Sequence, residues 1–178
     1  NFNIGTEFTL FNGVLDGSFE YFSRKTTDML FWFSVAPSVG YTGYYDNIGD
    51  MRNNGVEFSL TANIINTRDM NLALNFNATK VMNKILYLAD DVKTLNIDGH
   101  DGYNDGSYFI GEGLPLYTRY LKEFAGVGED GQSLWYKNVK DENGDITGRE
   151  TTNQYSTADY YLAPSSIPDW YGGFGLSF

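Results

Sequence analysis

The chain has 178 residues, of which 42% are hydrophobic and 17% aromatic, with no cysteine, a single histidine and a net charge of −11. Without cysteine it has no disulfides and no cysteine-based zinc site, and one histidine is too few for a histidine-rich metal centre. The acidic surplus argues against a duplex nucleic-acid binder, which needs a lysine and arginine surface to neutralise phosphates. We therefore expect no metal, no cofactor and no nucleic-acid partner.

A membrane-spanning helix is not expected, because no apolar window approaches the length of about 18 residues that such a helix needs. Transmembrane β-barrels distribute their apolar residues in alternation, so the mean hydropathy of −0.36 does not exclude a membrane. The stretch from Asn1 to Leu10 begins directly in a strand pattern and lacks the basic and apolar regions of a signal peptide. We therefore expect a piece of a longer protein.

The first predicted hairpin joins a strand at about residues 2–11 to a strand at about residues 14–24. Apolar and polar side chains alternate through both segments, which is the period-two pattern of a strand with two different faces. Asn12-Gly13, between them, is a preferred sequence of the type I′ hairpin turn.

The second predicted hairpin joins residues 54–65 to residues 69–80 through a short polar turn. Both segments alternate as regularly as the first pair, and residues 170–178 form a fifth alternating segment. Five strands of similar length are therefore predicted.

Two long connections separate these strands, at residues 25–52 and 84–169. Loops of that size are uncommon in compact soluble domains and are usually functional. Within the second connection, residues 116–127 and 132–139 have strand character, and Asn143-Gly144 favours a hairpin tip. Between residues 87 and 160 lie 14 of the 23 acidic residues, so the acidic surplus is concentrated in this connection.

The alternating pattern is compatible with a soluble β-sandwich and with a membrane barrel. The polar faces favour the barrel, because they carry few of the lysines that protect exposed sheet edges in soluble proteins. The strand lengths match the roughly 9 to 11 residues that a tilted strand needs to cross a bilayer, and short turns alternate with long connections as they do in barrels. We predict an all-β fold of antiparallel strands from a large transmembrane β-barrel. A soluble all-β carbohydrate-binding module is the alternative.

Several motifs along the chain point to one family. Residues 1–30 form a hairpin that runs into Tyr-Phe-x-Arg-Lys-Thr-x-Asp-x-Leu, beginning at Tyr21, and residues 47–60 contain Asn-Ile-Gly followed by Asn-x-Gly-Val-Glu. Further on come Gly113-Leu-Pro-Leu-Tyr, Ala125-Gly-Val and Ile167-Pro-Asp-Trp-Tyr-Gly-Gly-Phe. In this order the motifs resemble the SusC/RagA-like TonB-dependent outer-membrane transporters, over nearly the whole chain.

The resemblance implies that the chain supplies about five strands of a plugged barrel of roughly 22 strands. Members of the family import oligosaccharides, glycans or peptides across the bacterial outer membrane with energy transmitted by the TonB complex. They work with a SusD-like surface lipoprotein that covers the extracellular mouth. The expected function is therefore nutrient transport and not catalysis, with outer-membrane lipid around the strands.

If the short turns are periplasmic, both long connections lie outside the cell. Aromatic residues in the second connection are then candidates for stacking on sugar rings or for contacting the lipoprotein, although they also suit packing of the connection against itself. These candidates are Tyr103, Tyr108, Tyr117, Trp135 and Tyr136. On the polar strand faces, the candidates for lining a lumen are Glu7, Glu57, Asn63 and Asn75.

Acidic stretches in the second connection have the ligand types of a calcium loop. Asp141, Asn143 and Asp145 are spaced as such ligands, but Ile146 occupies the position that requires glycine, so a hairpin turn is favoured. Residues 98–105 are read as ordinary turn chemistry, and His100 within them as a solvated loop residue. An extracellular hydrolase is the weakest hypothesis, because no pair of carboxylates with an acid/base geometry is identifiable.

Overall fold

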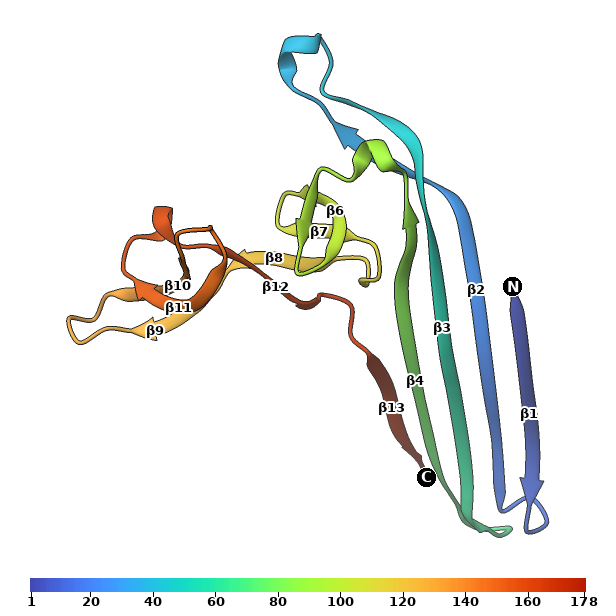
Figure 1. Ribbon diagram of the computed structural model, residues 1–178. Coiled ribbons are helices and arrows are strands. Elements are labelled where there is room, and N and C mark those ends of the chain that lie inside the picture. The colour runs from blue at the N-terminus through green and yellow to red at the C-terminus, as the bar shows by residue number, and fades with distance from the viewer.

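The computed structural model describes the backbone of residues 1–178 and all side chains except those of Phe31, Phe33, Ser34 and Ile48. The chain is built from antiparallel strands and short 3-10 helices (Figure 1). No helix in the described part is long and apolar enough to cross a membrane. In chain order the elements are β1 (Phe2–Leu10), β2 (Leu15–Ser34), η1 (Pro37–Val39), β3 (Gly43–Asn66), β4 (Asn71–Leu88), η2 (Asp90–Val92), β5 (Leu95–Ile97), β6 (His100–Asp105), β7 (Tyr108–Gly111), β8 (Thr118–Lys122), β9 (Phe124–Val127), β10 (Ser133–Lys140), β11 (Ile146–Thr152), η3 (Tyr155–Thr157), β12 (Tyr160–Ser165) and β13 (Trp170–Ser177).

The main sheet has the strand order β1-β2-β3-β4-β13, all antiparallel, and confirms the predicted all-β fold. Its register aligns residues of one kind into rows that cross the sheet. One row is apolar and the row beside it is polar, because successive side chains on a strand point to opposite faces. The apolar row is Phe8, Gly17, Leu60, Phe76 and Phe174, and the polar row is Glu7, Ser18, Ser59, Asn77 and Gly173.

The turn between β1 and β2 has the geometry that its sequence predicts. Asn12 and Gly13 adopt φ angles of 57° and 86°, and the N–H of Val14 donates to the carbonyl of Phe11. These positive φ angles at both central positions define a type I′ turn, which matches the twist of the flanking strands.

The predicted long loop at residues 25–52 is wrong, because most of it is strand. β2 continues to Ser34 and β3 begins at Gly43, which leaves a short connection that contains η1. Register shifts on β2 between Thr26 and Leu30, together with a φ of 53° at Asp28, interrupt the alternation. A bulge of this kind moves later side chains to the other face, so the period-two pattern no longer identifies the strand.

The predicted loop at residues 84–169 is wrong as a loop, although β8, β9 and β10 confirm the strand character expected at residues 116–127 and 132–139. β4 continues to Leu88, and the rest folds into β5–β12, a segment that we call the lobe (residues 89–169). Its strands form two sheets, of order β12-β8-β7-β6-β5 and β11-β10-β9. Figure 1 shows the first sheet near the upper end of β4 and the second farther from the main sheet.

The lobe is joined to β4 through backbone and side-chain hydrogen bonds. Ile85 donates its N–H to the carbonyl of Leu114 and accepts from the N–H of Gly113, both at 2.9 Å. Glu112 accepts the N–H of Leu88 at 2.7 Å and pairs with Lys93 Nζ at 3.0 Å. The buried core sits at this junction and consists of Ile85, Leu88, Val92, Tyr103 and Ile110.

Candidate functional site: a two-faced sheet and its lobe

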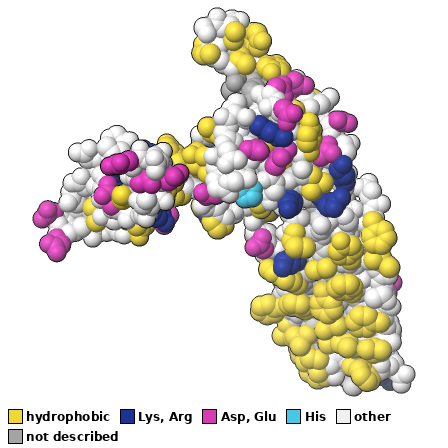
Figure 2. Space-filling view, viewed as in Figure 1, with side chains coloured by type: hydrophobic (Ala, Val, Ile, Leu, Met, Phe, Trp, Pro, Cys, Tyr) yellow, Lys and Arg dark blue, Asp and Glu magenta, His cyan; other side chains and the backbone are white. Residues whose placement is uncertain are grey.

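One face of the main sheet is apolar and exposed. Phe174 is 88% exposed and Leu176 64%, and Phe76 on β4 is 46% exposed. Figure 2 shows apolar side chains gathered in a yellow area over the lower part of the sheet. A soluble monomer rarely exposes a contiguous apolar surface of this kind, because the transfer of apolar area out of water is favourable. The face therefore needs an apolar environment.

The opposite face carries polar side chains that hydrogen-bond across strands. Thr9 donates to Asp16 at 2.7 Å, and Thr61 donates to Asn75 at 3.0 Å. The hydroxyls of Ser18 and Ser59 lie 2.7 Å apart. These bonds satisfy the polar groups strand by strand, so this face suits water or a polar partner.

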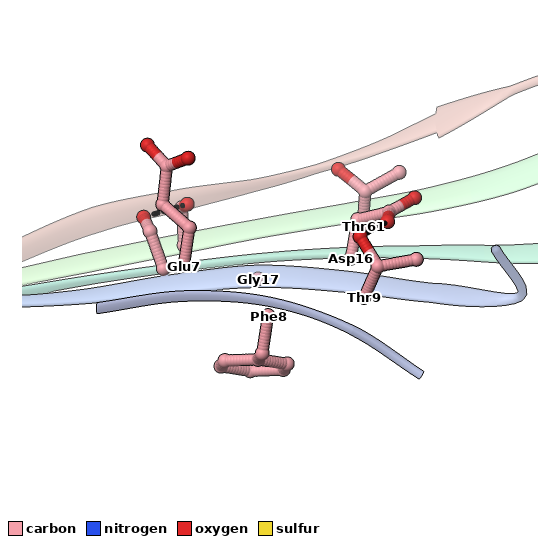
Figure 3. A pocket seen from close by; sticks show the side chains of 8 residues that line it. Glu7, Phe8, Thr9, Asp16, Gly17 and Thr61 are labelled. Atoms are coloured by element: carbon pink, nitrogen blue, oxygen red, sulfur yellow. Dashed lines mark hydrogen bonds between the residues drawn. The ribbon is translucent and has the colours of Figure 1, made fainter. Parts of the chain in front are cut away.

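Figure 3 shows the two faces at the β1-β2 hairpin, where an open depression is lined by Glu7, Thr9, Asp16 and Thr61. These polar side chains point away from one side of the strands, whereas the ring of Phe8 lies on the other side. The ring covers Gly17, since a Cβ at residue 17 would come within 2.8 Å of Phe8 Cε2. Gly17 thus leaves space for a neighbouring aromatic ring on the apolar face.

The four residues predicted to line a lumen all fall on the polar face. Asn75 lies opposite Thr61, and Glu57 lies between Glu20 and Thr79. Asn63 donates from Nδ2 to the carbonyl of Gly13 at 2.9 Å. Glu7 lies opposite Ser18. The register brings the four residues to one surface, and their contact with a lumen stays a prediction.

Tyr103 does not fit the predicted role of a ligand contact. Its side chain is 7% exposed and belongs to the core with Leu88 and Ile110. Burial, with a smaller contribution from the charge of Asp105, raises the pKa of the Tyr103 phenol to about 12. The sequence did not reveal this burial because β6 is short and the residues around Tyr103 are mostly polar.

Tyr108 and Tyr117 come together at the surface of the lobe. Their ring centroids are 5.4 Å apart in an edge-to-face arrangement, and Tyr117 is 47% exposed. The ring of Tyr117 is therefore accessible, and a contact of this pair with a ligand or a partner stays a prediction.

Trp135 and Tyr136 pack largely within the lobe. The Trp135 ring makes edge contacts with Phe124 and Tyr155, at centroid distances of 5.6 and 4.9 Å. The guanidinium of Arg149 lies 4.2 Å from the centroid of the Tyr136 ring. For these two residues, packing of the connection against itself accounts for the contacts observed.

Lys122 and Arg149 are two cationic residues of the lobe that sequence reasoning missed. Lys122 Nζ lies 4.5 Å from the ring centroid of Tyr155 and 5.2 Å from that of Tyr160. Arg149 contacts Tyr161 in the same way at 4.1 Å, and the hydrogen bond that Arg149 donates to Glu123 raises the pKa of Arg149. The partners are far apart in sequence, so no local pattern indicates these contacts.

The acidic stretches form turns, as the sequence favoured. Oδ1 of Asp141 accepts the N–H groups of Asn143 and Asp145, each at 2.9 Å, which closes the β10-β11 hairpin. His100 is half-buried in β6 and not a solvated loop residue, with Nδ1 2.7 Å from the carbonyl oxygen of Glu112. Among the described residues, no group of three histidine or acidic side chains is arranged to hold a metal ion.

Comparison with curated proteins finds similarity to TonB-dependent receptors along almost the whole chain, although no model of a protein family matches it. TonB-dependent receptor P3 of Formosa agariphila is 28% identical over 97% of this chain and 18% of the receptor. TonB-dependent receptor P39 of the same organism is 30% identical over 70% of this chain, and TonB-dependent receptor SusC of Bacteroides thetaiotaomicron 29% over 80%. The chain spans less than a fifth of the length of these relatives.

Solved structures give the same result for the fold. The chain superposes on the RagAB peptide importer in its closed-closed state with a TM-score of 0.73 and 28% identity. A second structure, of the RagAB peptide transporter, gives a TM-score of 0.75 and 26% identity. In each comparison 98% of this chain matches 18% of the solved chain.

Proposed function

Starting from a chain that is a SusC/RagA-like segment of a TonB-dependent transporter, we propose that it forms neighbouring strands in the wall of an outer-membrane nutrient importer. The observation that carries the proposal is the separation of apolar and polar rows across all five strands of the main sheet. In a barrel wall, the apolar face meets lipid and the polar face borders the plug and the translocation path.

The lengths of the connections support an orientation of this wall. The β1-β2 and β3-β4 turns lie at one end of the sheet, and the lobe and the β2-β3 connection lie at the other (Figure 1). Barrels of the outer membrane have short periplasmic turns and longer extracellular loops. The proposal therefore places the lobe outside the cell.

The lobe is then the part of this chain that meets a SusD-like lipoprotein and the incoming oligosaccharide, glycan or peptide. The candidate contact pair in the lobe is Tyr108 and Tyr117, of which Tyr117 is 47% exposed. The TonB complex acts through parts of the barrel protein outside these strands. The proposed role is transport without catalysis, and the names of the relatives, TonB-dependent receptor and peptide importer, support it.

Cysteine labelling of intact cells tests the orientation, because the chain has no cysteine of its own. Gly131→Cys and Asn143→Cys, in exposed turns of the lobe, are expected to react with a membrane-impermeant thiol reagent from outside. The matched control Thr67→Cys, in the β3-β4 turn, is expected to react only after the outer membrane is permeabilised. If only Thr67→Cys reacts in intact cells, the β3-β4 turn lies outside the cell and the proposed orientation is wrong.

The soluble alternative predicts a different result in fractionation. A wall segment keeps the barrel protein in the membrane fraction and makes its extraction dependent on detergent. A protein that is recovered as a monodisperse soluble species without detergent would refute the membrane assignment and favour a carbohydrate-binding module.

A further inference from the structure

Three basic residues stand side by side on the apolar face of the main sheet, beyond the apolar rows. Lys25 on β2 lies opposite Arg52 on β3, and Arg52 lies opposite Lys84 on β4. The pairing continues without a register shift from these residues to Leu15, Ala62 and Leu74, so steps of two residues keep all of them on one face. We call Lys25, Arg52 and Lys84 the basic row.

The basic row lies above a row that contains membrane-interface residue types. In that lower row Tyr21 is opposite Val56, Val56 is opposite Lys80, and Lys80 is opposite Trp170, with Lys80 Nζ 5.3 Å from the Trp170 ring centroid. Tyrosine and tryptophan concentrate at the boundary between lipid tails and headgroups. Lys25 is four residues beyond Tyr21, roughly 13 Å along the strand. The basic row is therefore at the level of lipid headgroups, and Figure 2 shows lysine and arginine side chains above the yellow area.

Only part of this positive charge is neutralised within the chain. Lys25 pairs with Asp50 at 2.7 Å. Arg52 and Lys84 are exposed, and among the side chains that the structure describes neither forms an ion pair. Like charges directly opposite each other on neighbouring strands repel. An anion from outside the chain that lies against the row offsets this repulsion.

We propose that the basic row binds the phosphate-bearing headgroup of an anionic lipid in the leaflet that surrounds the lobe end of the sheet. This inference rests on the proposed function, since it requires the apolar face to meet lipid. Lysine and arginine side chains near the end of a membrane-facing surface extend toward the headgroups, and their stems cover the adjacent apolar surface. The chain as a whole carries a net charge of −11, which repels anionic lipid, so a local group of cations is needed on the surface that meets an anionic headgroup.

The test compares lipid binding by the purified barrel protein in nanodiscs of phosphatidylcholine, titrated with lipid A or with dephosphorylated lipid A. The wild type is expected to prefer the phosphorylated form. The variant Lys25→Gln/Arg52→Gln/Lys84→Gln is expected to lose most of that preference, with about a fivefold loss for each charge removed at low ionic strength. Raising the salt concentration is expected to shrink the difference, because exposed charges are screened.

The matched control is Arg68→Gln/Lys137→Gln/Lys140→Gln, which removes the same charge from positions away from the basic row and is expected to keep the preference. If the triple variant of the basic row inserts poorly, Arg52→Gln alone carries the test with its fivefold change. Equal binding of the two lipids by a correctly inserted wild type would overturn the proposal while the barrel function stands. Failure of the wild type to insert at all would instead overturn the barrel function.

Discussion

The ring of Phe22 lies over Gly55, its cross-strand partner, so that a Cβ at residue 55 would come within 2.6 Å of Phe22 Cε1. The same Cβ would meet the carbonyl oxygen of Lys80 at 2.6 Å. Phe22 is only 6% exposed, and the guanidinium of Arg24 lies 5.1 Å from its ring centroid. Gly55 is thus required by a neighbouring ring and backbone, on the face that is otherwise polar.

Gly55→Ala is therefore expected to destabilise the sheet by about 1 to 3 kcal/mol, because the ring and the β4 backbone must both move. The measurement is the urea unfolding midpoint of the barrel protein in lipid vesicles. Gly175→Ala is the control, since a Cβ at Gly175 meets nothing within 4 Å and its stability is expected to stay unchanged. Equal stability of Gly55→Ala and wild type would contradict the packing of Phe22.

The two faces of β4 are expected to respond differently to the same added charge. Phe76→Lys places an ammonium in the middle of the apolar rows and is expected to cost about 2 to 4 kcal/mol in a bilayer. Asn77→Lys places the ammonium one residue along the strand, on the polar face, and is expected to cost far less. Unfolding of both variants in vesicles checks this, and equal losses would show that the faces do not differ in environment.

Tyr103 is expected to ionise late in an alkaline titration. Its pKa is raised from 10.0 to about 12, so the folded state holds the proton more tightly than the unfolded state. The stability gained from this difference is fully present below about pH 10 and is lost as the pH rises toward 12. When the folded protein is titrated with alkali, its tyrosinate absorbance is expected to rise in a late step. The Tyr103→Phe variant is expected to lack that step. A Tyr103→Phe titration identical to that of the wild type would place the late ionisation elsewhere.

The aromatic residues of the lobe are expected to separate into surface and packing roles. Tyr117→Ala is expected to weaken binding of the lipoprotein or ligand without changing the fold, because the ring is half-exposed in its pair with Tyr108. Trp135→Ala is expected to destabilise the β9-β11 sheet, since the ring contacts Phe124 and Tyr155. Binding assays paired with limited proteolysis of the lobe distinguish the two, and proteolysis of Tyr117→Ala at the wild-type rate is the required control.

The alternating strands were predictable because each carries its own local signal. Residues 55–64 alternate without interruption, residues 2–10 do so except at Thr6, and Asn12-Gly13 favours its own turn type. The extension of β2 past Lys25 was not predictable, because the bulge near Asp28 shifts the period and the exposed segment has no buried face to reveal it. Apolar and polar residues alternate along a strand only where its two faces meet different environments, and the pattern disappears where both faces meet water.

The sequence indicated strands at residues 116–127 and 132–139 and a hairpin tip at Asn143-Gly144, which the structure confirms, but it did not indicate how the lobe is assembled. Its strands are short, and its contacts join positions that are far apart, such as Lys122 with Tyr155 and Tyr161 with Asn138. The core at the end of β4 also combines residues from separate segments, including Ile85 and Tyr103. The candidate lumen residues were easier to place, because strand parity alone assigns each to a face.

The lobe leaves the main sheet at the end of β4 and returns on β13, the strand directly beside it. The pairing from Trp170 with Lys80 to Ser177 with Ala73 fixes the register of these two strands without any contribution from the lobe. Closing a longer loop costs only about 0.6 kcal/mol for each doubling of its length. We therefore expect the wall to tolerate exchange of the lobe beyond the core that it shares with Ile85 and Leu88, so that a new surface for capture can be grafted between two strands whose alignment stays the same.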